Sequence, residues 1–159
     1  MVCKNDFNRE WLIKKFEEIR KRILNAISQL DDEQLNWRPH ESSHSISTLI
    51  RHIEGNIKER ISKGILHQEI QRNREEELTH VFVEKSELEK ICAERLQFVI
   101  DTIRNISDET LEQKQIVRSR ERTNLDMLHQ CAAHFSEHMG QIFYIAKQCL
   151  KEDYKSTSL

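Results

Sequence analysis

The sequence predicts an all-α fold, because three observations agree on helices. Glycine occurs three times and proline once in 159 residues, so the chain has little turn material. Charged residues make up 33% of the chain, which suits exposed helix faces. Apolar residues also recur at steps of three and four along four long stretches. A chain of this length fits one core, so we expect residues 1–159 to form a single helical bundle with its core at about 8–151.

The first two helical stretches flank the longest loop that the sequence predicts. Apolar residues recur from about Asn8 to Gln29, and the chain then reaches LDDEQLNWRPHESSHS, where an acidic turn and Pro39 break the helix. A second helix is expected from Ser45, a common N-cap residue, to about Gly64. The charged stretch HQEIQRNREEELTHV that comes next has weak periodicity, and we interpret it as a solvated connection or a short helix.

Two capping boxes mark the remaining helices. Ser86 with Glu89 predicts the start of a helix that ends near residue 106 at ISDETL, and Thr123 with Asp126 predicts one that ends near residue 151. Because LDDEQL and ISDETL are similar, the chain is either a two-fold repeat of helix pairs or has two acidic helix ends that look alike. The tail, residues 152–159, is expected to fray.

Charge and composition exclude several classes of function. Lys and Arg number 25 against 27 Asp and Glu, which leaves no basic field for nucleic acid or anionic lipid. No apolar run approaches the roughly 20 residues of a membrane span, and the first residues, MVCKNDFNREW, lack an apolar signal region. We therefore expect a cytoplasmic protein that binds neither nucleic acid nor membranes. The cysteines stand far apart without a CxxC pair, which indicates reduced thiols: Cys3, Cys92, Cys131 and Cys149.

The segment HFSEH places two histidines four residues apart in the last helix. His134 and His138 share the inward face with Phe135 and Cys131. Residues at this spacing have Cβ atoms about 5–6 Å apart, so both imidazoles can reach one ion. The spacing allows chelation, and it equally allows two hydrogen-bonded core residues.

A third candidate ligand lies on the second helix. His52 stands at the edge of its apolar face, and Asn56 and Arg60 follow at four-residue steps. Facing helices of a bundle converge on one interior, where His52 could meet His134 and His138. Three imidazoles suit a divalent ion such as zinc or nickel and leave a coordination position open, as catalytic sites require. The alternatives are a neutral, hydrogen-bonded polar layer, or a His52 that points to solvent.

Four motifs lie along the chain: NWRP, SISTLIRHIEGN followed by Arg60, RNREEE and HFSEHMGQI. Together they resemble the DinB-like superfamily of metal-dependent four-helix-bundle proteins, and in particular a branch of unknown function. The resemblance extends from Trp11 to Lys147. It implies a bundle with long, non-standard crossover loops, and a homodimer. In that superfamily one histidine of the second helix and two of the fourth bind the metal, and these correspond to His52, His134 and His138.

The resemblance also implies a reaction for the site. Some DinB-like relatives are thiol-dependent enzymes, including bacillithiol and glutathione S-transferases and mycothiol-dependent maleylpyruvate isomerase, in which the ion lowers the pKa of the cofactor thiol. We take thiol transfer to a small-molecule substrate, with a low-molecular-weight thiol as cofactor, as the leading hypothesis. A second is metal-assisted hydrolysis with Glu137 as base, although Glu137 points about 100° away from His138 on the helix. A third is a non-catalytic dimer whose histidines are structural or hold a ligand.

Other residues near the predicted site have more than one interpretation. Asn56 and Arg60 either contact a substrate anion or a ligand histidine, or form a buried salt bridge with the charged region 72–77. Cys131 is a fourth ligand, a redox thiol or a small core residue. The remaining histidines are expected at the surface, although one of them, His44, could approach the site: His40, His44, His67, His80 and His129.

Overall fold

The computed structural model, which describes residues 4–158, confirms the all-α prediction. Four long helices form the bundle: α1 (Asp6–Ser28), α3 (Ile46–Ile57), α5 (Lys85–Asn105) and α7 (Asn124–Leu150). Shorter elements connect them: α2 (Asp32–Asn36), the π-helix η1 (Lys58–Lys63), α4 (Arg74–Glu77), α6 (Asp108–Glu112), the hairpin β1 (Lys114–Val117) and β2 (Arg120–Thr123), and the 3-10 helix η2 (Lys151–Asp153). No helix in the described part of the chain is long and apolar enough to cross a membrane.

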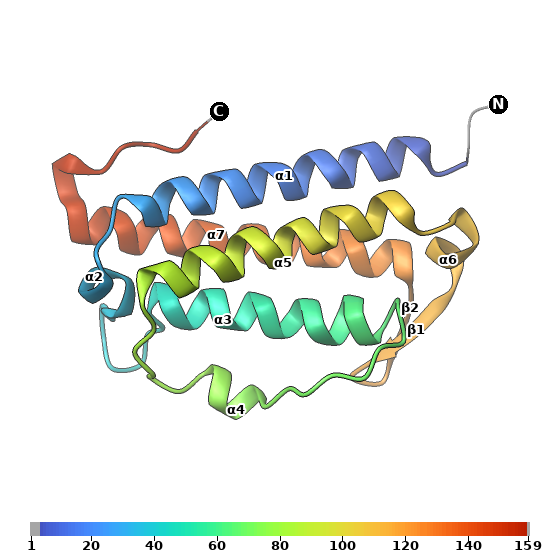
Figure 1. The fold of residues 1–159 in the computed structure, drawn as a ribbon, viewed down its shortest axis with the longest axis horizontal. Coiled ribbons are helices and arrows are strands. Elements are labelled where there is room, and N and C mark those ends of the chain that lie inside the picture. Colours follow the sequence, from blue (N-terminus) through green and yellow to red (C-terminus); the bar gives the residue numbers. More distant parts are fainter. Residues whose placement is uncertain (1–3, 159) are drawn as a thin grey trace.

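The helices are arranged so that neighbours in sequence are not always neighbours in space. Both α1 and α3 pack against α5 and α7, so α1 and α3 lie across the bundle from each other. Figure 1 shows that α3 and α5, which are in contact, run in the same direction. The segment 64–84 must therefore return along the whole bundle, and it does so on the outside of α3, with α4 in its middle. This is the long crossover that the resemblance implied.

The apolar stripes of the long helices meet in one core. Phe16 of α1 and Phe135 of α7 are fully buried and pack edge to face, with ring centroids 6.1 Å apart. At the start of α1 the structure buries Leu12, while the adjacent Trp11 stays 42% exposed. Burial of such side chains from all four helices supplies the main stabilisation of the bundle.

Two of the three predicted helix starts are confirmed. The Ser45 side chain accepts a hydrogen bond from the Thr48 backbone N–H, and Thr123 accepts one from that of Asp126. The prediction from Ser86 and Glu89 was wrong, because α5 begins at Lys85. The Lys85 backbone N–H donates to the Asp32 carboxylate, 2.6 Å away on α2. A partner that is remote in sequence thus satisfies the helix end, and a local capping pattern cannot reveal it.

The two similar acidic segments form matching short helices. Asp31 caps α2 through a hydrogen bond from the Gln34 backbone N–H, and Ser107 caps α6 through one from Thr110. Each short helix has five residues and separates a long helix from the histidine-bearing helix of its half. The halves differ in the next element along the chain, because only α6 leads into a hairpin, which the sequence analysis did not predict.

The C-terminal tail, which was expected to fray, has contacts with α1 and with Gln29 at Lys155 and Thr157. The Gln29 side chain donates to the Lys155 carbonyl (3.0 Å) and accepts from the Lys155 backbone N–H (2.9 Å). Arg22 donates to the Thr157 hydroxyl, and Thr157 is 3% exposed. Side chains of α1 and the residue after it therefore hold the tail by giving its polar groups partners. Leu159 lies outside the described residues.

The crossover is fastened to α3 at one close contact. Glu77, in α4, lies so near Gly55 that a Cβ at Gly55 would be 2.0 Å from the Glu77 carboxylate. Arg51 of α3 adds hydrogen bonds to the Glu76 and Thr79 carbonyls. Any side chain at Gly55 would therefore have to displace the Glu77 carboxylate.

We expect Gly55→Ala to lower the free energy of unfolding by about 1–3 kcal/mol, because the added methyl group must displace a buried carboxylate. Gly140→Ala is the matched control, since a Cβ there meets nothing within 4 Å in an exposed part of α7. That control should raise the free energy of unfolding by about 0.5–1 kcal/mol. Urea unfolding of both variants measures the difference, and two variants of equal stability would contradict the proposed close contact.

Candidate metal centre

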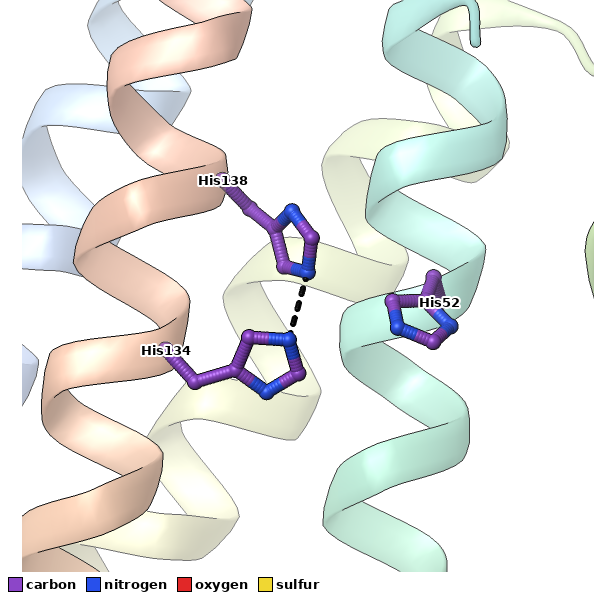
Figure 2. Close-up of side chains that lie close together, drawn as sticks. All are labelled: His52, His134 and His138. Carbon is purple, nitrogen blue, oxygen red and sulfur yellow. Dashed lines mark hydrogen bonds between the residues drawn. The ribbon is translucent and has the colours of Figure 1, made fainter.

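Three histidines from two facing helices converge in the interior of the bundle. His52 projects from α3 toward His134 and His138 on α7 (Figure 2). One ring nitrogen of each lies within 4.8 Å of those of the other two, and the three rings are partly buried. Within residues 4–158, no other group of three or more His, Cys, Asp or Glu side chains has this geometry. The structure thus brings together the three residues that the sequence singled out, and they could hold one ion.

Hydrogen bonds define the proton positions on the two α7 histidines. Arg60 in η1 lies 3.2 Å from His134 Nδ1, and because a guanidinium only donates, Nδ1 accepts and the proton is on Nε2. His134 Nε2 then donates to His138 Nε2, 2.8 Å away. His138 therefore carries its proton on Nδ1, which donates to the Gln141 side-chain oxygen at 2.8 Å. The chain of hydrogen bonds is consistent from Arg60 to Gln141.

His52 is oriented by partners on both sides of its ring. Its Nδ1 faces the Glu77 carboxylate at 3.4 Å, and its Nε2 accepts from the Asn56 amide at 3.2 Å. Arg72 holds Glu77 through two hydrogen bonds of 2.7 and 3.0 Å. The side chains of His52 and Glu77 are each only 12% exposed. A carboxylate behind one ring nitrogen directs the lone pair of the other toward the site, as in many metal-binding histidines.

The three imidazoles fit a divalent ion after three local adjustments. The Asn56 amide must give up its hydrogen bond to His52 Nε2, because Glu77 faces Nδ1 and Nε2 carries the lone pair that would bind the ion. Ligands about 2.1 Å from a tetrahedral ion lie about 3.4 Å apart, so the 2.8 Å contact between His134 and His138 must open slightly. Ligation through His134 Nε2 also moves the ring proton to Nδ1. Without the ion, that Nδ1 accepts a hydrogen bond from the Arg60 guanidinium. Arg60 must therefore turn away from His134. The donor set itself, with nitrogen ligands only, suits zinc or nickel.

Burial keeps two of the rings neutral. The pKa of His134 is lowered to about 4, mainly by burial, with added repulsion from His138 and Arg60. The pKa of His52 is also lowered from its ordinary value, first by burial and then by repulsion from His138, although Glu77 opposes the change. Metal ligation requires neutral imidazole, so neither ring has to lose a charge near pH 7.

The other residues named from the sequence now have positions. Asn56 and Arg60 each contact a histidine, and neither pairs with the charged region 72–77. Cys131 is fully buried, and burial raises the pKa of its thiol to about 11. It lies outside the histidine cluster. Glu137 is exposed, and so is His44, which does not join the cluster.

Two contacts of the site escaped the sequence analysis. Glu77 lies in the charged crossover, 25 residues from His52, and its neighbours Glu75 and Glu76 look the same in sequence. The only local signal was Gly55 within a helix, a position that calls for a close neighbour. Gln141 follows His138 by three residues, a spacing that could have indicated a hydrogen bond along the helix.

Comparisons with known proteins agree with this geometry at the level of the fold. A DinB-like protein from Bacillus cereus is similar with a TM-score of 0.71 and 13% identity, over 88% of this chain and 91% of that one. YfiT from Bacillus subtilis, described as a probable metal-dependent hydrolase with an unusual four-helix bundle topology, has a TM-score of 0.72 and 14% identity, over 94% and 90%. A conserved protein from Enterococcus faecalis also has a TM-score of 0.72, with 16% identity over 92% and 97%.

The family comparison covers nearly the whole chain. No curated protein matches the sequence. The structural neighbours have the DinB-like four-helix bundle that the motifs indicated, so the resemblance is confirmed. A family model matches residues 6–159. The chain therefore belongs to the DUF1572 family, which is described as proteins of unknown function.

Proposed function

We propose that this protein is a metal-dependent enzyme that transfers a low-molecular-weight thiol to an electrophilic small molecule. His52, His134 and His138 hold a zinc or nickel ion in this proposal. The observation that carries it is the convergence of three imidazole nitrogens within 4.8 Å of one another, from two helices. Three protein ligands leave at least one coordination position for another molecule, which is typical of catalytic rather than structural zinc sites.

The ion would supply one piece of chemistry, the lowering of the pKa of a thiol or water ligand, so that a nucleophile forms near pH 7. The chain's own residues hold the imidazoles in place. Glu77 holds the ring of His52 through its Nδ1, and Gln141 holds that of His138 through its Nδ1. This support keeps the three nitrogens directed at one point.

The reacting thiol must come from outside the described chain. Burial raises the pKa of Cys131 to about 11 and that of Cys92 to about 12, so both remain protonated near neutral pH. The pKa of Cys149 is also raised, again by burial first. Because the thiolate is the nucleophile, these cysteines are poor candidates. A small thiol that enters the site accounts for the chemistry better.

The surroundings of the histidines also favour a nucleophile that needs no carboxylate base. Glu137 is exposed, and Glu77 is already engaged by Arg72 and His52. In the transfer reaction, the thiolate sulfur forms a bond to the electrophilic carbon while the leaving group departs with the bonding electron pair. The thiol proton goes to the buffer. Metal-assisted hydrolysis is the second candidate, and the description of YfiT as a probable metal-dependent hydrolase favours it.

Elemental analysis of protein purified without a histidine tag tests the metal. We expect about one zinc or nickel per chain, and its loss in the double variant His134→Ala with His138→Ala. The double variant His40→Ala with His44→Ala is the control, because both residues are exposed and lie outside the cluster. A wild-type protein that takes up neither ion after incubation with both would refute the proposed centre.

Assays with the metal-loaded protein separate the two reactions. We expect conjugation of glutathione or bacillithiol to monochlorobimane, with a rate at least about 100-fold lower in His52→Ala, because a missing ligand lowers metal affinity and activity. Cys131→Ala should keep the rate within about two-fold, since its thiol is not the nucleophile. Thiol-independent hydrolysis of 4-nitrophenyl acetate, lost in His52→Ala, would support the second candidate. If the metal-loaded protein showed neither of these two activities, the proposal that it is an enzyme would be refuted.

The metal-free protein should show the low pKa of His134 directly. We expect its ring to titrate near pH 4, against 6.5 for an ordinary histidine. The unfolded state then binds more protons between these values, so the free energy of unfolding falls as the pH falls through this window. NMR of the ring protons measures the pKa. His134→Gln should lose less stability over the same range, and a ring that titrates at or above pH 6.5 would contradict the assignment.

A further inference from the structure

A cavity of about 500 Å³ opens beside the histidines, and most of its charge comes from arginine. It has the size of a small-molecule site. His134 belongs to its wall, so the cavity reaches the candidate metal centre. The lining residues are Arg60, Val117, Arg118, Arg120, Arg122, Met127, Gln130 and His134. None of them is acidic.

The β1–β2 hairpin presents the arginines to this cavity. Val117 pairs with Arg120 and Gln115 with Arg122, so these residues share one face of the hairpin. Ile116, on the other face, is 71% exposed. The Gln115 amide donates to the Arg60 carbonyl of η1 (3.2 Å) and to the Asn124 side chain of α7 (2.8 Å). The hairpin is thus anchored to both elements that border the histidines.

The hairpin turn has an arginine at a backbone conformation that glycine adopts with less strain. Two residues, Arg118 and Ser119, connect the strands, and their φ angles are 50° and 65°. Such turns usually contain asparagine or glycine, because other side chains are strained at positive φ. Arg118 lines the cavity in spite of that strain. Strained positions cluster at binding sites, which favours a role for this side chain.

The charge in the cavity is only partly balanced within the described chain. Arg122 pairs with Asp126 at 2.7 Å. Arg60 is hydrogen-bonded to the neutral ring of His134, and no ion pair with a carboxylate of residues 4–158 engages Arg60, Arg118 or Arg120. The whole chain has a net charge of −2, so the positive charge is local. Three of the four guanidinium groups at the cavity thus lack a carboxylate partner among the described residues, and together they create a site that favours an anion.

We propose that this cavity binds the carboxylate or phosphate group of a small molecule and places the rest of that molecule at the histidines. Guanidinium groups match both anions because they donate two parallel hydrogen bonds. The reaction that follows binding rests on the proposed function. The cavity adds to that function the class of ligand, which is anionic. The anion could belong to the thiol or to the electrophile, since both enter the same site.

The first test is anion binding by metal-free protein, followed by NMR at constant ionic strength. Succinate is the probe, and succinamide is its neutral counterpart of similar shape. We expect succinate to shift the amide signals of the hairpin and of η1, and succinamide to bind at least five-fold more weakly. Equal binding of the two, or shifts confined to another surface, would overturn the proposal.

Two substitutions in the turn separate charge from backbone strain. Arg118→Gly and Ser119→Gly both relieve a residue at positive φ, and only the first removes a guanidinium group. We expect Arg118→Gly to weaken succinate binding at least five-fold without lowering the melting temperature, and Ser119→Gly to bind like the wild type. Equal effects of the two variants on binding would overturn the role of Arg118.

A second pair of variants matches the loss of total charge. Arg118→Gln with Arg120→Gln removes two charges from the cavity, while Arg104→Gln with Lys114→Gln removes two exposed charges that do not line it. We expect at least ten-fold weaker succinate binding in the first variant and less than a two-fold change in the second. Similar losses in both would show a general charge effect and overturn the site.

Kinetics then identify which reactant carries the anion, with monochlorobimane as a neutral electrophile. If Arg118→Gly raises the KM for glutathione and not the KM for cysteamine, which has no carboxylate, the thiol carries the anionic group. If neither of these KM values changes and the KM for an anionic electrophile rises, the electrophile carries the anionic group. The two proposals fail separately. Succinate binding without any histidine-dependent reaction refutes only the enzyme, and thiol transfer without preference for succinate refutes only the anion site.

Discussion

The parallel alignment of α3 and α5 is the constraint on which the rest of the structure depends. Two adjacent helices that run in the same direction cannot be joined by a short turn, so the segment between them must travel back along the bundle. That return brings Glu77 onto the surface of α3, where Gly55 leaves room for it, and there the carboxylate meets His52. The topology thus supplies the partner that orients one candidate ligand. A bundle with an ordinary short connection between these helices would leave the His52 ring without this support.

Arg60 links the candidate metal centre to the cavity beside it, because its guanidinium contacts His134 and also lines that cavity. The π-helix places it within hydrogen-bonding distance of His134, and the same side chain lines the cavity. Donation to His134 Nδ1 is incompatible with ligation through Nε2, since the neutral ring carries one proton. An ion on His134 and an anion in the cavity would both draw Arg60 away from the histidine. Binding at the two places would therefore be mutually reinforcing, as linkage requires when two ligands favour the same side-chain position.

The sequence predicted best what local spacing controls. Apolar periodicity located the four helices, Ser45 and Thr123 marked two of their starts, and a step of four residues placed His134 and His138 on one face. Contacts between distant segments could not be seen in this way. Asp32 satisfies the start of α5 from another helix, and Glu77 reaches His52 only through the path of the crossover. The hairpin was missed for a different reason: QIVRSRERT lacks the glycine or asparagine that announces a tight turn, so its strained turn resembles a charged loop.

The similarity of the two halves explains where the site lies and why it is asymmetric. In each half a long helix is followed by a five-residue helix, a connection and a helix that carries histidine, and the two histidine helices pack against each other. One contributes His52 and the other His134 and His138. The connections differ, since an irregular loop with Pro39 precedes α3 and the arginine-bearing hairpin precedes α7. The similar helices thus supply the imidazoles, and of the two unequal connections it is the hairpin that lines the cavity at His134.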